Sequence, residues 1–168
     1  MTAMELPPFW SMMIWGLAAT VAMTSVLQGA QGMGLSRLSL PFLAGTFFTA
    51  DRRWAVTIGF VFYVIGGWIF AFLYFLLFAS IGVYTWWLGL LAGLLHGLFL
   101  LAGVLPLLPY IHPRMASEYD GVSGVRPLEP PGFMGLNYGH RTPLTTLAGQ
   151  ALYGLVLGGL PQLSSALR

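Results

Sequence analysis

Three histidines are the side chains in this sequence best suited to chemistry. His96 lies inside the apolar run LLAGLLHGLFLL, whereas His112 and His140 lie in YIHPRM and NYGHRT, where prolines, glycines and arginines interrupt the apolar sequence. An imidazole can relay protons or ligate a metal, a haem or a chlorophyll-type pigment. An ionisable group inside a membrane-length apolar run is costly and therefore a functional candidate. This makes His96 the candidate cofactor-binding residue.

A structural role for His96 is the competing interpretation. A neutral imidazole can donate one hydrogen bond to a neighbouring helix without binding any cofactor. No other apolar run contains a histidine, so two histidines of this chain cannot clamp a haem within the membrane.

Catalysis and metal binding have little support. The stretch SEYD (117–120), with Arg126 and Glu129, has the composition of a solvated loop with local ion pairs, and no serine lies in a G-x-S-x-G context. The spacing of His112 and His140 relative to the acidic residues matches no known metal-ligand pattern. We therefore expect a protein that is not an enzyme and has no metal site.

The composition indicates an integral membrane protein. Hydrophobic residues make up 57% of the 168 residues and charged residues 7%, with a mean hydropathy of +0.79. Too few charged side chains are present to cover the surface of a soluble domain. No basic run suggests nucleic acid, so the expected partners are membrane lipids and other membrane subunits, or further copies of this chain.

The expected fold is an all-α bundle of four transmembrane helices in one domain, residues 1–168, with two longer cytoplasmic loops. Thr142 and Pro143 mark the start of the last helix, and Pro161 is expected to close it. The spans are predicted at about 8–28, 54–79, 84–108 and 144–160, and the loops at 29–53 and 109–143.

Arginine positions predict the orientation of the bundle. All seven basic residues are arginines, and six of them fall in the two long loops. Because positive charge favours the cytoplasmic side, we expect both termini in the periplasm and the long loops in the cytoplasm of a bacterial inner membrane.

Small and polar residues four apart mark the faces on which the helices are expected to pack. Membrane helices associate through close backbone approach and shared polar contacts. The predicted packing residues are Gly16, Thr20 and Thr24 on the first span; Gly89, Gly93 and Gly97 on the third; and Gln150, Gly154 and Gly158 on the fourth. The alternative is that Thr20, Thr24, Gln28, Gln150 and His96 line a polar path.

A weak internal echo suggests duplication. MGLSRLSLPFLAG (33–45) and MGLNYGHRTPLTTLAG (134–149) share MGL, an arginine, and LAG at the same distance after that arginine. If the repeat is real, residues 39–50 form a short amphipathic or re-entrant helix that corresponds to the start of the fourth span.

The second long loop is expected to be ordered. Its stretch EPPGFMGLNYGHRTP is aromatic and punctuated by glycine and proline, unlike a disordered linker. Phe133, Leu136 and Tyr138 are predicted to fold back onto the bundle or onto a partner. The residues expected to contact lipid or a partner are His112, Arg114, Tyr138, His140 and Arg141.

The C-terminal half resembles a group of uncharacterised bacterial multi-pass inner-membrane proteins. The resemblance lies in LLAGLLHGLFLLAGVLPLLPYIHPRM, PPGFMGLNYGHRTP and LAGQALYGLVLGG. In that group the third span carries a Gly-His-Gly-type motif and ends in His-Pro, and a histidine often stands where this chain has Gln150. The resemblance implies four spans and no particular activity.

Three functional hypotheses follow. The first is a non-catalytic accessory or scaffolding subunit of a larger respiratory or photosynthetic membrane complex. The second is a small oligomeric transporter or channel that uses the polar path. The third is a haem- or chlorophyll-binding protein ligated by His96.

Overall fold

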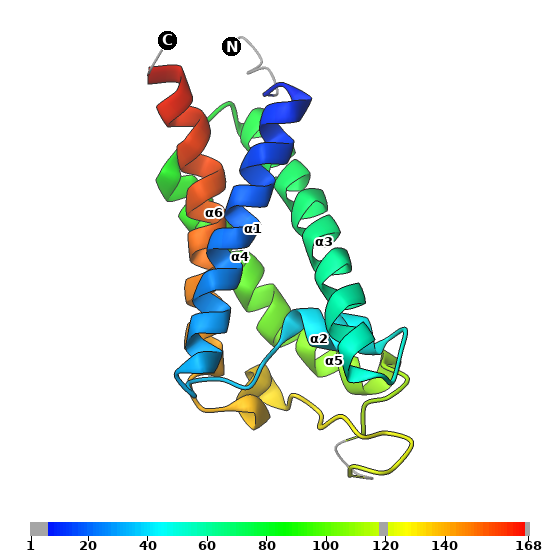
Figure 1. Ribbon diagram of the computed structural model, residues 1–168. Coiled ribbons are helices and arrows are strands. Elements are labelled where there is room, and N and C mark those ends of the chain that lie inside the picture. Colours follow the sequence, from blue (N-terminus) through cyan, green and yellow to red (C-terminus); the bar gives the residue numbers. More distant parts are fainter. Residues whose placement is uncertain (1–6, 118–120, 167–168) are drawn as a thin grey trace. The chain divides into compact units, whose positions relative to one another are not determined.

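The computed structural model describes residues 7–117 and 121–166, whose regular structure is helical (Figure 1). Within these ranges a parallel β-bridge joins Met115 to Leu128. The elements are α1 (Phe9–Gly32), α2 (Leu40–Thr46), α3 (Arg52–Ile81), α4 (Trp86–Phe99), the π-helical turn η1 (Leu100–Val104), α5 (Leu105–Ile111), the 3-10 segment η2 (Phe133–Tyr138) and α6 (Thr142–Ala166).

Three helical runs in the described part of the chain are long and apolar enough to cross a membrane. They are Phe9–Gly32, Arg52–Ile81 and Trp86–Ile111, the last of which joins α4, η1 and α5. The all-helical class and these three spans agree with the sequence expectation. The fourth predicted span corresponds to α6, which is 25 residues long but is not among the three.

The contacts divide the chain into two units. The first contains residues 1–26, 64–97 and 147–168, and the second contains residues 27–63 and 98–146. In the first unit α1 packs antiparallel on α3. A Cβ built on Gly16 would lie 3.0 Å from Ala71 Cβ, and one on Gly67 would collide with the Thr20 hydroxyl. This pairing therefore depends on small residues on both helices.

α4 and α6 also pack antiparallel in the first unit, with their backbones in contact. A Cβ on Gly89 would collide with the carbonyl of Gly154, and one on Gly93 would collide with that of Gln150. A Cβ on Gly158 would likewise collide with the carbonyl of Thr85. Such close approach gives membrane helices the dispersion contacts that replace a hydrophobic drive.

In the second unit the short helix α2 lies against the first turns of α3, and Figure 1 draws both in cyan tones. A Cβ on Gly45 would collide with the carbonyl of Ala55, and one on Gly59 with that of Pro41. Ser39 caps α2, because its Oγ accepts the Phe42 N–H at 3.4 Å. The predicted short helix within 39–50 is therefore present as Leu40–Thr46.

Prolines lie near the C-terminal ends of the last two long helical runs, α4–η1–α5 and α6. α5 ends before Pro113, because the residue before a proline favours extended backbone, and His112 has ψ 120°. The expectation that Pro161 closes the last helix was wrong, because α6 continues through Pro161 to Ala166. A proline inside a helix removes one backbone donor and crowds the carbonyl four residues before it, which can kink a helix without ending it.

The two halves of the internal echo share a local geometry. Each contains a Met-Gly-Leu turn whose glycine has a positive φ, 71° at Gly34 and 76° at Gly135. A helix with proline near its start follows in each case, with Pro41 in α2 and Pro143 in α6. The two copies also touch, since the hydroxyls of Ser36 and Thr142 lie 2.8 Å apart.

Candidate functional site

His96 lies on α4 among aromatic rings of the first unit. Its Nδ1 is 3.3 Å from the Tyr74 hydroxyl, and the centroid of its ring is 4.2 Å from that of Phe70. The ring centroid of Tyr153 lies 6.5 Å from that of His96 in a T-shaped arrangement, and the Tyr153 hydroxyl donates to the carbonyl of Gly67 at 2.5 Å. The imidazole is half-buried and has a hydrogen-bond partner through one ring nitrogen.

The other polar residues predicted to line the helices bond mostly within their own helix. Thr20 donates to the carbonyl of Gly16 at 2.8 Å, and Thr24 donates to that of Thr20 at 2.6 Å. The side-chain oxygen of Gln150 is buried without a hydrogen-bond partner among the described residues, whereas Gln28 is exposed. Gly97 lies beside the Gln150 side chain.

His112 belongs to the second unit and can titrate near neutral pH. It is buried, with 3% of its surface exposed. Its Nδ1 accepts the backbone N–H of Arg114 at 3.1 Å, so the proton of the neutral ring lies on Nε2. Nε2 faces the carbonyl of Leu43 at 3.2 Å and the hydroxyl of Thr46 at 3.1 Å. His112 thereby ties the end of α5 to α2.

Two features lower the pKa of His112 below its ordinary value. Burial is the larger one, because it penalises the charged ring, and the nearby Arg114 charge acts in the same direction. The hydrogen bond to the Leu43 carbonyl opposes them in part. His112 is consequently held as a neutral hydrogen-bond donor.

Arg114 completes this connection through its guanidinium. Nη1 donates to the carbonyls of Thr46 and Phe47, at 2.7 and 3.1 Å, where α2 ends. A cation at a helix C-terminus satisfies carbonyls that have no intrahelical partner. Arg114 is therefore committed to the protein's own backbone, whereas His140 and Arg141 are exposed.

The loop that contains Tyr138 folds back as expected at that residue. Tyr138 is buried, and its hydroxyl donates to the carbonyl of Glu129 at 2.6 Å. Phe133 and Leu136 remain exposed, at 69% and 43%. Burial, with a smaller contribution from the Glu129 charge, raises the pKa of Tyr138 to about 12.

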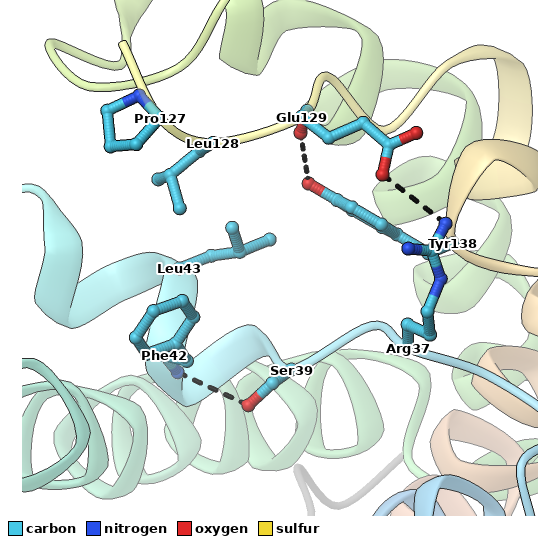
Figure 2. A pocket seen from close by; sticks show the side chains of 8 residues that line it. All are labelled: Arg37, Ser39, Phe42, Leu43, Pro127, Leu128, Glu129 and Tyr138. Carbon is cyan, nitrogen blue, oxygen red and sulfur yellow. Dashed lines mark hydrogen bonds and ion pairs between the residues drawn. The ribbon is translucent and has the colours of Figure 1, made fainter. Parts of the chain in front are cut away.

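A surface pocket of about 190 Å³ lies between α2 and this loop (Figure 2). Figure 2 shows an apolar side and a polar side that face each other across the opening. The apolar side is formed by Phe42, Leu43, Pro127 and Leu128, and the polar groups come from Arg37, Ser39, Glu129 and Tyr138.

The polar groups of the pocket are held by backbone contacts. The Arg37 guanidinium donates to the carbonyl of Asn137 at 2.5 Å and lies 3.3 Å from the Glu129 carboxylate. Its backbone N–H donates to the Tyr138 carbonyl at 2.7 Å. The pocket therefore contains adjacent opposite charges on a preorganised frame.

Comparison with protein-family models, with curated proteins and with solved structures gave no match for this chain.

The predicted loop ion pairs are only partly accounted for. Glu129 pairs with Arg37 rather than with a residue of its own loop, and this was missed because the two are far apart in sequence. Glu118, Tyr119 and Asp120 lie outside the described residues. No group of three metal-ligating side chains occurs within the described ranges.

Replacing Tyr138 with phenylalanine is expected to lower stability by about 1 kcal/mol, because one buried hydrogen bond is lost. The raised pKa adds a pH dependence. The stabilisation that comes from keeping the Tyr138 hydroxyl protonated is fully present below the ordinary tyrosine pKa of 10.0. It decreases as the pH rises towards the folded-state pKa of about 12. Melting temperatures of both proteins in detergent from pH 8 to 11 should show the wild-type advantage shrinking above pH 10. An advantage that is constant over this range would contradict the assignment.

Proposed function

We propose that this chain is a non-catalytic integral membrane protein of the bacterial inner membrane that acts as an accessory or scaffolding subunit of a larger membrane complex, of respiratory or photosynthetic type. The observation that carries the proposal is the division of α3 into two faces. One face packs inside the first unit through buried residues such as Gly67, Ala71 and Phe75. The opposite face is a stripe of exposed apolar side chains.

The exposed stripe has helical spacing. It consists of Ile65, Ile69, Phe72, Leu73 and Leu76, each 37–57% exposed. Residues three and four apart share one side of a helix, so these side chains form a continuous apolar surface. Such a surface suits lipid tails and partner helices.

Polar groups of the long helices support the same proposal, because several are already used to hold the helices together. The Trp68 indole donates to the carbonyl of Met13 at 3.0 Å, and Tyr153 donates to that of Gly67. Hydroxyls bonded to their own helix, as in Thr20 and Thr24, are less available to a transported solute. These bonds favour a packing role over a polar path.

In the proposed topology α6 is the fourth span. The segments with exposed arginines, such as Arg52, Arg53 and Arg126, are cytoplasmic, and both termini are periplasmic. Because the chain has no cysteine, single cysteines can report the side of each loop. We expect Ser80→Cys to react with an impermeant maleimide in intact cells. Ser123→Cys should react only after the inner membrane is opened, and the reverse pattern would invert the topology.

A second candidate function, ligation of a haem or chlorophyll-type pigment by His96, is favoured by the pairing of His96 with Tyr74. Ligating histidines usually hydrogen-bond through the ring nitrogen that does not bind the metal. With Nδ1 beside the Tyr74 hydroxyl, Nε2 is the nitrogen available to a ligand.

Extraction in a mild detergent, followed by native mass determination and a visible spectrum of the same sample, tests these proposals. A particle much larger than 18.3 kDa, containing other subunits, supports the accessory role. Visible absorbance that is lost in His96→Ala and kept in His140→Ala supports ligation. A colourless homo-oligomer contradicts both and favours a transporter. The transporter hypothesis requires a flux in proteoliposomes that is lost in His96→Ala and Gln150→Ala.

A further inference from the structure

We propose that the pocket between α2 and the second long loop binds a phospho-ammonium zwitterion, the headgroup chemistry of phosphatidylethanolamine. The phosphate would bind at Arg37 and Ser39, and the ammonium at Glu129. The residues that form the pocket all belong to the second unit.

The charges of the pocket match such a ligand. The Arg37 guanidinium and the Glu129 carboxylate lie 3.3 Å apart, yet their side chains are 68% and 45% exposed. An exposed ion pair contributes little to stability, so a ligand can replace it at small cost. A zwitterion replaces both partners at once, whereas an anion or a cation would leave one charge without its counterion.

Hydrogen-bonding capacity remains on both charged groups. The guanidinium has five N–H donors, of which one is directed to the carbonyl of Asn137. The Ser39 Oγ accepts the Phe42 N–H, which leaves its proton to donate. The Glu129 carboxylate can accept from a primary ammonium, whereas a trimethylammonium has no N–H to donate.

The position of the pocket indicates a membrane lipid as the source of the zwitterion. The pocket is lined by two segments: residues 33–51, which connect α1 to α3, and the loop from residue 112, which follows α5. Because successive spans alternate in direction, the end of the first candidate span, the start of the second and the end of the third all lie at the same membrane boundary. Lipid headgroups occupy this level. The Arg52 guanidinium lies 6.0 Å from the centroid of the ring of Phe42, which lines the pocket.

The dimensions of the pocket also fit a headgroup. Pockets for drug-sized ligands occupy about 300–1,000 Å³. The volume here is about 190 Å³, and the apolar side formed by Leu43 and Leu128 can accept the glycerol end of the lipid.

Native mass spectrometry of the full chain in detergent, with phosphatidylethanolamine, phosphatidylcholine or phosphatidylglycerol added, tests the proposal. We expect phosphatidylethanolamine to bind about tenfold more tightly than the other two lipids, since only it satisfies both charges with hydrogen bonds. Arg37→Gln should weaken its binding about tenfold. Glu129→Gln should abolish the preference while the fold is kept, because Tyr138 bonds to the main-chain carbonyl of residue 129.

Arg126→Gln is the matched control, because Arg126 lies in the same loop but does not line the pocket. It should bind the three lipids as the wild type does. Equal binding of the lipids in wild type and variants would overturn the proposal. So would a preference for phosphatidylglycerol that depends on Arg37 but not on Glu129, because that pattern describes an anion site.

Free phosphoethanolamine distinguishes the two sources of the zwitterion. If millimolar phosphoethanolamine leaves the lipid adduct in place, the bound species is the lipid. If it displaces the lipid and binds with the same dependence on Arg37 and Glu129, the zwitterion site is supported and recognises the headgroup without the lipid tails.

Discussion

Replacing Gly154 with alanine is expected to destabilise the protein by about 3 kcal/mol, at the upper end of the usual cost of overpacking. The added Cβ would collide with the backbone carbonyl of Gly89, and α4 and α6 would have to separate to relieve the clash. A flexible side chain could move aside, but a carbonyl held in a helix cannot. For a chain of this length the melting temperature in detergent should decrease by roughly 6–12 °C.

Gly159→Ala is the matched control on the same helix. There the new Cβ would meet only the Cβ of Trp86, at 3.7 Å, which is an ordinary contact. Stability should be unchanged, or raised by up to about 1 kcal/mol through the better helix propensity of alanine. Equal melting temperatures for the two variants would show that α4 and α6 do not pack through their backbones.

The reciprocal change, Gly89→Ala, tests the same contact from α4. Its Cβ would collide with the carbonyl of Gly154, so a similar loss of stability is expected. Combining the two changes should cost less than the sum of their separate effects, because the first substitution already separates the helices.

The sequence predicted those parts of the fold that depend on local patterns. Small residues four apart on α4 and α6 share one helical face, so their pattern alone predicts a packing surface, and the glycines do lie against the facing helix. α2 is only seven residues long, too short for a convincing periodicity, yet Ser39 and Pro41 have the residue types of a helix start. Its partner glycine, Gly59, was missed because the contact depends on the fold.

The candidate site could not be predicted in the same way. The pocket brings Arg37 beside Glu129 and Tyr138, which follow it by some ninety residues or more, and no local pattern indicates which arginine pairs with which carboxylate. Likewise, His112 was predicted from the sequence to contact lipid or a partner. Its actual contacts, the Thr46 hydroxyl and the Leu43 carbonyl, come from a distant helix.

A pH-dependent loss of stability is expected at His112. Because burial and the Arg114 charge lower its pKa in the folded protein, the unfolded chain binds the proton first as the pH decreases through the ordinary value of 6.5. Stability due to the neutral ring is thus fully present above pH 6.5. It decreases below that value by up to about 1.4 kcal/mol per pH unit, until the folded pKa is reached.

His112→Asn isolates this effect. Asparagine can still offer an oxygen to the Arg114 N–H that Nδ1 accepts, but it does not titrate. It lacks the reach of Nε2 to Leu43 and Thr46, so we expect it to be less stable at pH 7.5 and to lose less on acidification. Melting temperatures from pH 7.5 to 5.0 measure both effects. His96 and His140 are present in both proteins, so the difference between the curves belongs to His112. Parallel curves would contradict the lowered pKa of His112, because they would mean that the ring is protonated as easily in the folded chain as in the unfolded one.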